Sequence, residues 1–336
     1  MAIDLLNIQP HKVSRDLSAY IIYIYGKGGT GKTTLASQMD KALLLACERG
    51  YNAIPGVIAQ DITSWVEMKQ VIRELKKPSV KEAYKSIIID TVDIASLLCE
   101  KYICNQLEIE EIGDGGWAKN GWAKVKRELE TTMREIAQMG YALFFISHDK
   151  EKTEKTVDGL EYTRITPSLS NAYNEIIRNM SDIQGYAHQV RLENGVPQVM
   201  LTLRSMDGSI ECKSRFKMIE PEIPFNYDSL AKALNDAIEK EANANNNEFV
   251  TDERSEVPEE EEYDFEEAVA SFKKLVAQIQ ENVTKTEFKT VWTPKITEIT
   301  DKYLGAGKKI VDCTNKQAGQ IVLIVEELTE LVGQGI

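Results

Sequence analysis

Short apolar runs recur along the first half of the chain, each too brief to form a buried helix. They occupy residues 20–25, 42–47, 86–91 and 141–146. Uninterrupted apolar runs of this length are typical of parallel strands that are covered on both faces of a sheet. Between these runs, apolar residues recur at helical spacing, which predicts helices over about 33–40, 62–75, 94–107 and 124–138. The alternation predicts an α/β fold with a mostly parallel sheet flanked by helices.

The pattern changes after the fourth apolar run. Residues 149–170 are polar and charged, and they are too many for a routine connection, so we expect a functional loop there. Strand-like patterns follow over 182–192, 197–205 and 209–216. Because Asp207 and Gly208 favour a turn, the last two of these strands are predicted to pair as an antiparallel hairpin. A helix over about 229–241 then closes the domain.

Beyond this core the composition changes. Residues 243–262 are rich in Asn and Glu and hold almost no large apolar residues, which predicts a flexible acidic linker. Two apolar stripes, separated by Pro294, Gly305 and Gly307, predict a small all-α domain of about three helices over 265–333. The predicted organisation is a lead-in over 1–19, an α/β core over 20–242, the linker over 243–262 and a helical domain over 263–336.

The acidic residues are concentrated in one segment. Residues 236–267 hold 14 acidic and two basic residues, which is nearly all of the formal net charge of −13. The rest of the chain is close to neutral. A local basic surface for nucleic acid is therefore compatible with the composition.

The five cysteines form no C-x-x-C pair and are odd in number. Reduced thiols in a cytosol-like compartment fit this pattern better than a disulfide framework does. No apolar run approaches the ~20 residues needed to span a bilayer, and the first residues lack the apolar core of a signal peptide. We expect a cytoplasmic protein with no membrane partner.

A glycine-rich stretch between the first strand and the first helix has the pattern G-x-x-x-x-G-K-[ST]. Its glycines let successive backbone N–H groups turn toward one anion, and the helix N-terminus adds partial positive charge. In this setting Lys32 would reach the β- and γ-phosphates of ATP, and the Thr33 hydroxyl would hold Mg²⁺. The alternative is a glycine-rich turn with a surface lysine. The predicted phosphate-binding residues are Gly26, Lys27, Gly28, Gly29, Thr30, Gly31, Lys32, Thr33 and Thr34.

Polar residues follow three other predicted strands, and parallel strands end at one edge of a sheet. Asp90 has the place of a carboxylate that holds the hydration shell of Mg²⁺; the alternative is a cap of the next helix, although Thr91 and Asp93 suit that role better. Glu48 would orient and partly deprotonate the attacking water, or else is a solvated surface residue. His148 would contact the γ-phosphate, or else is a structural histidine.

The order of these residues resembles the RecA/RadA core. More closely, residues 18–235 resemble the phage AAA-domain proteins described as single-strand annealing or recombination ATPases; segments 43–51 and 62–65 carry the likeness beyond the motif. The resemblance implies a RecA-like fold, Glu48 as catalytic base, Asp90 as the Mg²⁺ residue and His148 as sensor. If a phage encodes the chain, the compartment is the host cytoplasm.

Lys213-Ser214-Arg215-Phe216 resembles the K-x-R finger with which RadA- and DnaB-like subunits reach the γ-phosphate of a neighbour. It implies a filament or ring whose sites are shared between subunits, with Lys213 and Arg215 as catalytic residues. The alternative is a pair of exposed basic residues that protect an edge strand. Lys27 also matches the loop of ParA/MinD partition ATPases, in which an early lysine completes the site of a dimer partner.

RecA-like proteins bind single-stranded DNA through two loops, and the matching segments here are about 113–122 and 149–171. Tyr162 would stack on a base, and lysines would contact phosphates. The alternative for both loops is ordinary solvated surface. The predicted nucleic-acid residues are Lys119, Lys150, Lys152, Lys155, Tyr162 and Arg164.

Two functions remain open from the sequence. The first is an ATP-hydrolysing, self-associating protein that binds single-stranded DNA and promotes annealing or strand pairing. The second is a ParA-like or regulatory ATPase switch that signals to a protein partner through residues 263–336, without nucleic acid.

Overall fold

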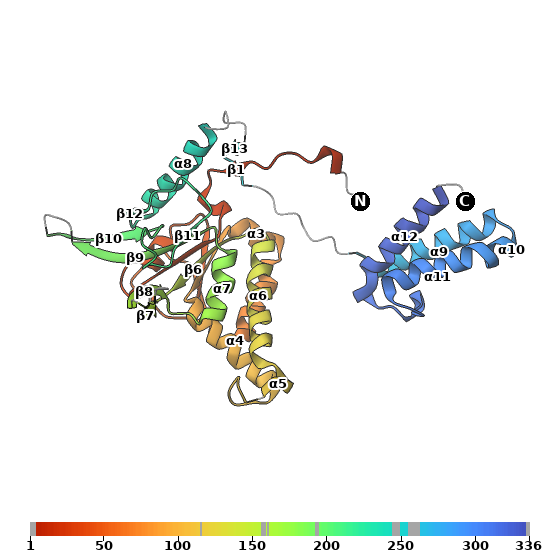
Figure 1. Cartoon of the computed structure of the whole chain (residues 1–336), viewed down its shortest axis with the longest axis horizontal. Helices are drawn as coiled ribbons and strands as arrows, with labels where there is room; N and C mark the ends of the chain where they lie inside the picture. Colours follow the sequence, from red (N-terminus) through yellow and green to blue (C-terminus); the bar gives the residue numbers. More distant parts are fainter. Residues whose placement is uncertain are drawn as a thin grey trace. The chain divides into compact units, whose positions relative to one another are not determined.

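The main sheet is formed by nine strands within the described part of the chain, all from the first 224 residues (Figure 1). The structure is a computed structural model and describes residues 5–114, 116–155, 159, 161–191, 195–243, 249–254 and 263–333. The strands are β2 (Ile22–Gly26), β3 (Ala42–Ala46), β4 (Ala59–Asp61), β5 (Ser86–Asp90), β6 (Ala142–Ser147), β9 (Ile183–Arg191), β10 (Pro197–Thr202), β11 (Lys213–Ser214) and β12 (Glu222–Pro224). Their order is β12-β10-β9-β2-β6-β5-β3-β4, and β11 also pairs with β9.

Six neighbouring strands, from β9 across to β4, run parallel. Their carboxyl ends therefore meet at one edge of the sheet, which brings the glycine-rich stretch together with the residues that follow β3, β5 and β6. The α/β prediction with a mostly parallel sheet is confirmed.

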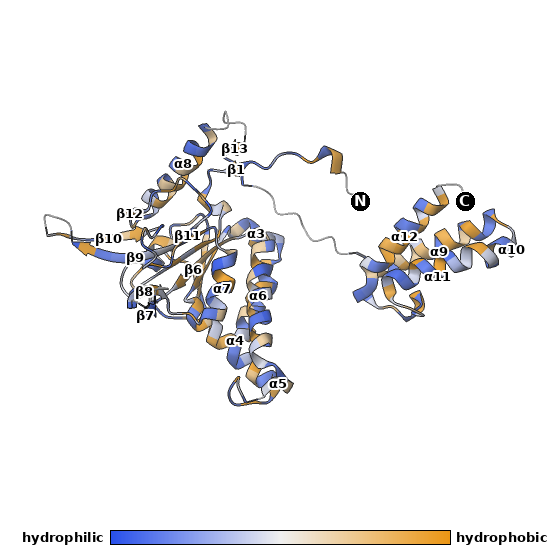
Figure 2. Ribbon diagram, in the orientation of Figure 1, coloured by the Kyte–Doolittle hydropathy of each residue, from blue (hydrophilic) through white to orange (hydrophobic). Residues whose placement is uncertain are grey.

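Helices cover both faces of the sheet, as the continuous apolar runs require. Side chains alternate along a strand, so Ile87 and Ile89 point to one face and Ile88 points to the other. The first face packs against α2 (Trp65–Leu75), α4 (Val92–Leu107), α6 (Gly121–Gln138) and α7 (Asn171–Met180). The second packs against α1 (Lys32–Ala36) and α8 (Tyr227–Asn243). Figure 2 shows hydrophobic strands between helices whose outer faces are hydrophilic.

Some helices differ from the prediction. The first helix ends at Ala36 rather than near residue 40. The expected glycine-rich loop over 113–122 contains the short helix α5 (Gly116–Lys119) and the start of α6. The pattern did not indicate α3 (Pro78–Ala83) or α7.

The prediction of a loop over 149–170 is wrong, because most of the segment forms strands. This segment forms β7 (Asp149–Lys155) and β8 (Glu161–Pro167), which pair antiparallel with Lys152 opposite Arg164. The sequence shows no apolar strand pattern here, because most of the residue pairs across the two strands are charged or polar. Residues 156–158 and 160 lie outside the described residues.

The predicted pairing of 197–205 with 209–216 is also wrong. β10 pairs with β9 and β12, while β11 pairs with β9 at Gln184 and Ile183. Thus β10 and β11 pair one after the other with the same side of β9. Residues 203–212 connect them by leaving the sheet and returning to it. The Asp207 carboxylate explains the excursion, because it accepts hydrogen bonds from Ser205 and Ser209 and closes a local turn.

Part of the predicted linker packs against the α/β core. β13 (Val250–Thr251) pairs with β1 (Val13–Ser14), and Arg15 forms ion pairs with Glu239 and Asp252. Residues 249–254 are therefore fixed to the N-terminal lead-in and to α8. Residues 244–248 and 255–262 lie outside the described residues.

The chain divides into two compact units, Met1–Pro258 and Glu259–Ile336. In the second unit the two predicted apolar stripes lie on α9 (Phe265–Asn282) and α12 (Ala318–Gly333), which share a core with α11 (Thr293–Leu304). Shorter segments are α10 (Lys285–Glu287) and the π-helical η3 (Phe288–Trp292). Within the described residues, no helix is both long and apolar enough to cross a membrane.

Candidate nucleotide site

The glycine-rich stretch connects the end of β2 with the first residue of α1, as its motif requires. Gly29 and Gly31 have φ values of +78° and +88°, a region in which side chains with a Cβ are strained. A Cβ at Gly26 would lie 2.2 Å from the carbonyl oxygen of Ala187 on β9, whereas a Cβ at Gly28 would meet no atom within 4 Å. The glycines thus permit both the turn and a close approach to the sheet, and they leave the outer side of the loop open.

Lys32 is buried beneath this loop, with 6% of its surface exposed. Its ammonium donates to the carbonyl oxygens of Gly26 at 2.6 Å and Lys27 at 2.9 Å. Burial lowers the pKa of Lys32, and nearby carboxylates, Asp90 first among them, oppose that shift. The ammonium is therefore held at the loop by main-chain oxygens, which an anionic ligand would replace.

Thr33 and Asp90 meet directly at the end of β5. The Thr33 hydroxyl donates to Asp90 Oδ2 at 2.6 Å, and Asp90 is 5% exposed. Burial raises the pKa of the Asp90 carboxyl, and the hydrogen bond from Thr33 lowers it. A hydroxyl beside a carboxylate is a set of hard oxygen donors, the kind that Mg²⁺ prefers.

Glu48 lies beside Asp90 because the N–H groups of Cys47 and Glu48 both donate to the Asp90 carbonyl, at 2.7 and 3.1 Å. Its carboxylate accepts a hydrogen bond from the Thr91 hydroxyl at 2.5 Å and lies 3.4 Å from His148 Nε2. About a third of the Glu48 side chain is exposed, at 34%, so water has access to it. Thr91 is the N-cap residue of α4, as predicted, but its hydroxyl binds Glu48 and makes no cap hydrogen bond.

Negative charge exceeds positive charge at this edge of the sheet. Four carboxylates lie near enough to the Lys32 ammonium to stabilise its charge. Such an excess favours a divalent cation, and the open loop with its buried lysine favours phosphate. The residues present therefore fit a Mg²⁺–nucleotide. The four carboxylates are those of Asp90, Asp149, Asp93 and Glu48.

The structure brings together every predicted site residue from the loop and the strand ends, but it places Lys213 and Arg215 elsewhere. β11 pairs with Ile183 and Gln184 at the start of β9, which lie three to four residues and about 10–13 Å along the strand from Ala187, the partner of Gly26. The Lys213 ammonium donates to the carbonyl oxygen of Arg178 at 2.6 Å, at the end of α7. Arg215 forms an ion pair with Asp182 at 3.0 Å. Neither side chain lies at the nucleotide site of its own chain.

The predicted nucleic-acid residues are not gathered on one surface. Lys119 donates to the Leu107 carbonyl at 2.6 Å and so closes the end of α4, whereas Lys150 donates to the Ser168 carbonyl at 3.1 Å. Figure 1 shows α5, which carries Lys119, well apart from β7 and β8.

The other four of these residues make contacts within the hairpin. Glu154 contacts Lys152 at 3.1 Å, Tyr162 at 2.9 Å and Arg164 at 3.3 Å. Lys155 forms an ion pair with Glu161 at 3.1 Å. These pairings depend on strand register, which the net charge of the segment does not indicate.

The sequence pattern did not indicate Ser168, and it predicted Asp93 to be a helix cap. The Ser147 hydroxyl donates to Asp93 Oδ1 at 3.1 Å, and the Ser168 hydroxyl donates to the same oxygen. One signal was present, because Asp93 follows Asp90 by three residues and lies in the first turn of the helix that begins at this sheet edge. No local signal indicated Ser168.

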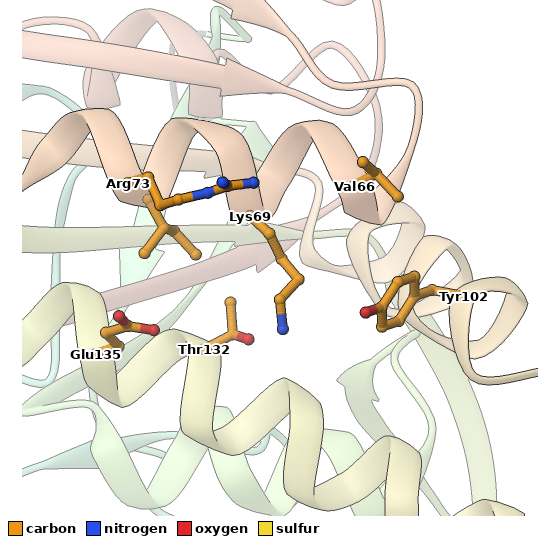
Figure 3. A pocket seen from close by; sticks show the side chains of 7 residues that line it. Val66, Lys69, Arg73, Tyr102, Thr132 and Glu135 are labelled. Carbon is orange, nitrogen blue, oxygen red and sulfur yellow. The ribbon is translucent and has the colours of Figure 1, made fainter. Parts of the chain in front are cut away.

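A separate pocket of about 320 Å³ lies between α2, α4 and α6 (Figure 3). Lys69 extends into it from α2 and forms an ion pair with Glu128 at 2.5 Å. This pocket contains none of the predicted site residues; it is lined by Val66, Lys69, Ile72, Arg73, Tyr102, Thr132 and Glu135.

A parallel sheet with this loop, a buried lysine and carboxylates at the neighbouring strand ends defines a P-loop ATPase. The comparison with known families agrees: a family model described as an AAA domain matches residues 18–216, and the chain belongs to that family.

Among curated proteins, an uncharacterized protein, YorG, derived from the SPbeta prophage of Bacillus subtilis (strain 168) is 30% identical over 344 residues. The match covers 99% of this chain and 100% of YorG. Among solved structures, a KaiC-like protein from Pyrococcus horikoshii OT3 is 14% identical, with a TM-score of 0.36, over 64% of this chain and 94% of the other.

Proposed function

We propose that this protein is a Mg²⁺-dependent ATPase that binds single-stranded DNA and promotes annealing or strand pairing as an oligomer. The observation that carries the ATPase part is the set of contacts at the strand ends, where Thr33 binds Asp90, and Glu48 lies between Thr91 and His148. The resemblance to phage annealing and recombination ATPases supports the DNA part.

Each residue of the site has a role in hydrolysis. Lys32 would exchange its carbonyl partners for phosphate oxygens, and Thr33 and Asp90 would hold Mg²⁺, which would neutralise phosphate charge. Glu48 accepts a hydrogen bond from the attacking water and takes its proton as the water oxygen bonds to the γ-phosphorus. At the same time the bond from the γ-phosphorus to the β–γ bridging oxygen breaks, and ADP leaves with that oxygen. Thr91 keeps the Glu48 carboxylate in place for that step.

His148 is suited to transmit the state of the site. It lies 3.4 Å from Glu48 and directly precedes β7, while its carbonyl oxygen accepts a hydrogen bond from the Ser168 N–H at 2.8 Å, just beyond β8. Both ends of the hairpin are therefore anchored beside the nucleotide. Through this anchor, hydrolysis would change the surface that the hairpin offers to DNA.

A second copy of the chain would complete the site. Lys213 and Arg215 are too far along β9 to reach their own nucleotide, so a part in hydrolysis requires a neighbour. Both side chains would have to leave their present partners, the carbonyl groups at the end of α7 and Asp182.

One observation favours the second candidate, a regulatory switch that acts on a protein partner. Lys152, Lys155 and Arg164 already have acidic partners on the hairpin, and Lys150 donates to main-chain carbonyl groups, so these residues would attract DNA phosphates only weakly. In that case residues 263–336 would carry the contact with the partner.

ATPase rate and oligomer size with and without single-stranded DNA separate the two functions. The proposal expects DNA to stimulate the rate and Lys152→Glu to remove the stimulation. Lys232→Glu, on the exposed side of α8, is the control and should leave it unchanged. ATPase activity that DNA does not alter at low or high salt would overturn the DNA part and leave the switch.

Mixing experiments test the shared site. The double variant Lys213→Ala/Arg215→Ala and the single variant Lys32→Ala should each be inactive alone, and their mixture should recover activity. A neighbour's finger contributes ~10³–10⁵ in rate in other P-loop enzymes, so recovery would be easy to detect. A mixture that stays inactive while both variants still assemble would show that the sites are not shared.

A further inference from the structure

Asp93 connects the nucleotide site with the base of the β7–β8 hairpin. It lies in the first turn of α4, three residues beyond Asp90. Its Oδ1 accepts hydrogen bonds from the Ser147 hydroxyl, at the end of β6, and from the Ser168 hydroxyl, just beyond β8. One carboxylate oxygen therefore holds the residues that flank the hairpin at both ends.

The other oxygen of the same carboxylate is unusual. Asp93 Oδ2 is buried and has no hydrogen-bond partner among the described residues. A buried polar atom without a partner is costly, typically ~1–3 kcal/mol, and it calls for an explanation from function or from a group that arrives later. A donor from a neighbouring residue that moves when the nucleotide binds would satisfy it.

The negative charge of Asp93 also acts on the nucleotide site. It is one of the four carboxylates that stabilise the Lys32 ammonium, together with Asp90, Asp149 and Glu48. When Lys32 turns to phosphate and a divalent cation joins the site, the balance of charge around Asp93 changes. The hydrogen bonds from the two serines depend on that charge, because a carboxylate accepts more strongly than a neutral group.

Other contacts at the hairpin base do not involve α4. The Ser168 N–H donates to the His148 carbonyl, and the Lys150 ammonium donates to the carbonyl groups of Ser168 and Leu169. These bonds hold the two strands to each other. Asp93 instead joins them to the helix that begins beside Asp90.

We propose that Asp93 is a positioning residue that couples nucleotide binding to the conformation of the β7–β8 hairpin, through the hydroxyl groups of Ser147 and Ser168. This inference rests on the proposed ATPase function and deepens it, because it names the side chain that carries the signal. Asp93 itself does not contact the reacting phosphate.

Hydrogen–deuterium exchange of the full chain tests the coupling. The amide exchange of segments 149–155 and 161–167 is measured with and without Mg²⁺ and a slowly hydrolysed ATP analogue, and nucleotide affinity is measured in parallel. In the unaltered protein the nucleotide should change exchange in both segments. In Asp93→Ala that change should be lost when the nucleotide concentration is high enough to saturate the site.

Milder variants guard against misfolding. Asp93→Asn keeps the size of the side chain but removes its charge, and Ser168→Ala removes one of the two hydroxyl groups; both should reduce the nucleotide-dependent change. Ser96→Ala is the matched control, because Ser96 donates to the Asp93 carbonyl rather than to its carboxylate. It should leave the change intact.

The outcomes separate the coupling from the ATPase function itself. If the unaltered chain does not bind nucleotide, both proposals fail. If it binds nucleotide but the hairpin does not respond, or if Asp93→Ala and Asp93→Asn respond as the unaltered chain does, only the coupling fails. A loss of Mg²⁺–nucleotide affinity in Asp93→Asn as large as that in Asp90→Asn would make Asp93 a ligand-binding residue and would also overturn the coupling.

Discussion

The nucleotide site and the β7–β8 hairpin are both rich in charged side chains, yet their charges have different partners. At the site, Asp90 and Glu48 accept hydrogen bonds from threonine hydroxyls, and the Lys32 ammonium donates to main-chain carbonyl groups. On the hairpin, opposite charges meet each other, with Glu154 as their centre. The charged groups of the site are therefore available to a ligand, whereas most charged side chains of the hairpin neutralise one another.

This difference shows when a charged residue indicates function. Charge that is buried without an opposite charge costs free energy, and it persists where a ligand compensates it. Charge that is paired on an exposed strand contributes little and indicates mainly a stable surface. Four predictions test the contrast.

The largest effect is expected for Glu48→Gln. The amide keeps the size of the side chain but cannot draw a proton from water, so turnover should fall by ~10²–10⁴ while nucleotide affinity remains. Single-turnover hydrolysis and binding of a fluorescent ATP analogue measure the two quantities. Glu82→Gln, at an exposed position in α3, is the control. Unchanged turnover in Glu48→Gln would remove this residue from the mechanism.

Lys32→Ala should lower the ATPase rate by a factor on the order of 10²–10³, because the ammonium that neutralises phosphate is lost. Nucleotide affinity should fall with it, as measured by titration. Lys27→Ala is the matched control, since Lys27 is exposed on the same loop. A loss in Lys27→Ala as large as that in Lys32→Ala would contradict the present assignment and support a ParA-like dimer.

Gly26→Ala should destabilise the core by ~1–3 kcal/mol, because its Cβ would lie 2.2 Å from the main-chain oxygen of Ala187. Gly28→Ala, which meets no atom within 4 Å, should leave the unfolding midpoint unchanged. Chemical denaturation of both variants measures the difference. Equal midpoints would mean that β2 and β9 separate easily at the loop, and that the site is less rigid than the structure indicates.

Arg164→Ala should also destabilise the protein, by about 1–3 kcal/mol, because Glu154 and the mostly buried Glu211 lose a cationic partner. Lys155→Ala should change stability by less than about 0.5 kcal/mol, since its pair with Glu161 is exposed. Thermal unfolding compares them. If Arg164→Ala kept full stability but lost stimulation by DNA, Arg164 would be a ligand-binding residue, and the contrast between site and hairpin would not hold.

The nucleotide site was largely predictable because its geometry follows from local rules. The glycines determine the turn after β2, and each short apolar run becomes a strand buried on both faces. Since parallel strands end at one edge, Glu48 and Asp90 had to lie near Lys32 once the strands were recognised. The sequence by itself thus determined the class of fold, the loop and the main acidic residues.

Tertiary structure alone decided the rest. Ser168 contacts Asp93, which lies 75 positions away in the chain. Arg164 on β8 likewise forms an ion pair with Glu211, which is also distant in sequence. Tertiary structure also decided the place of β11, which continues along β9 instead of pairing with β10. Such contacts depend on strand register and on which distant side chains meet. Two strands that carry many charged residues can pair equally well in several registers. The spacing of residues along the chain does not indicate which of these registers forms.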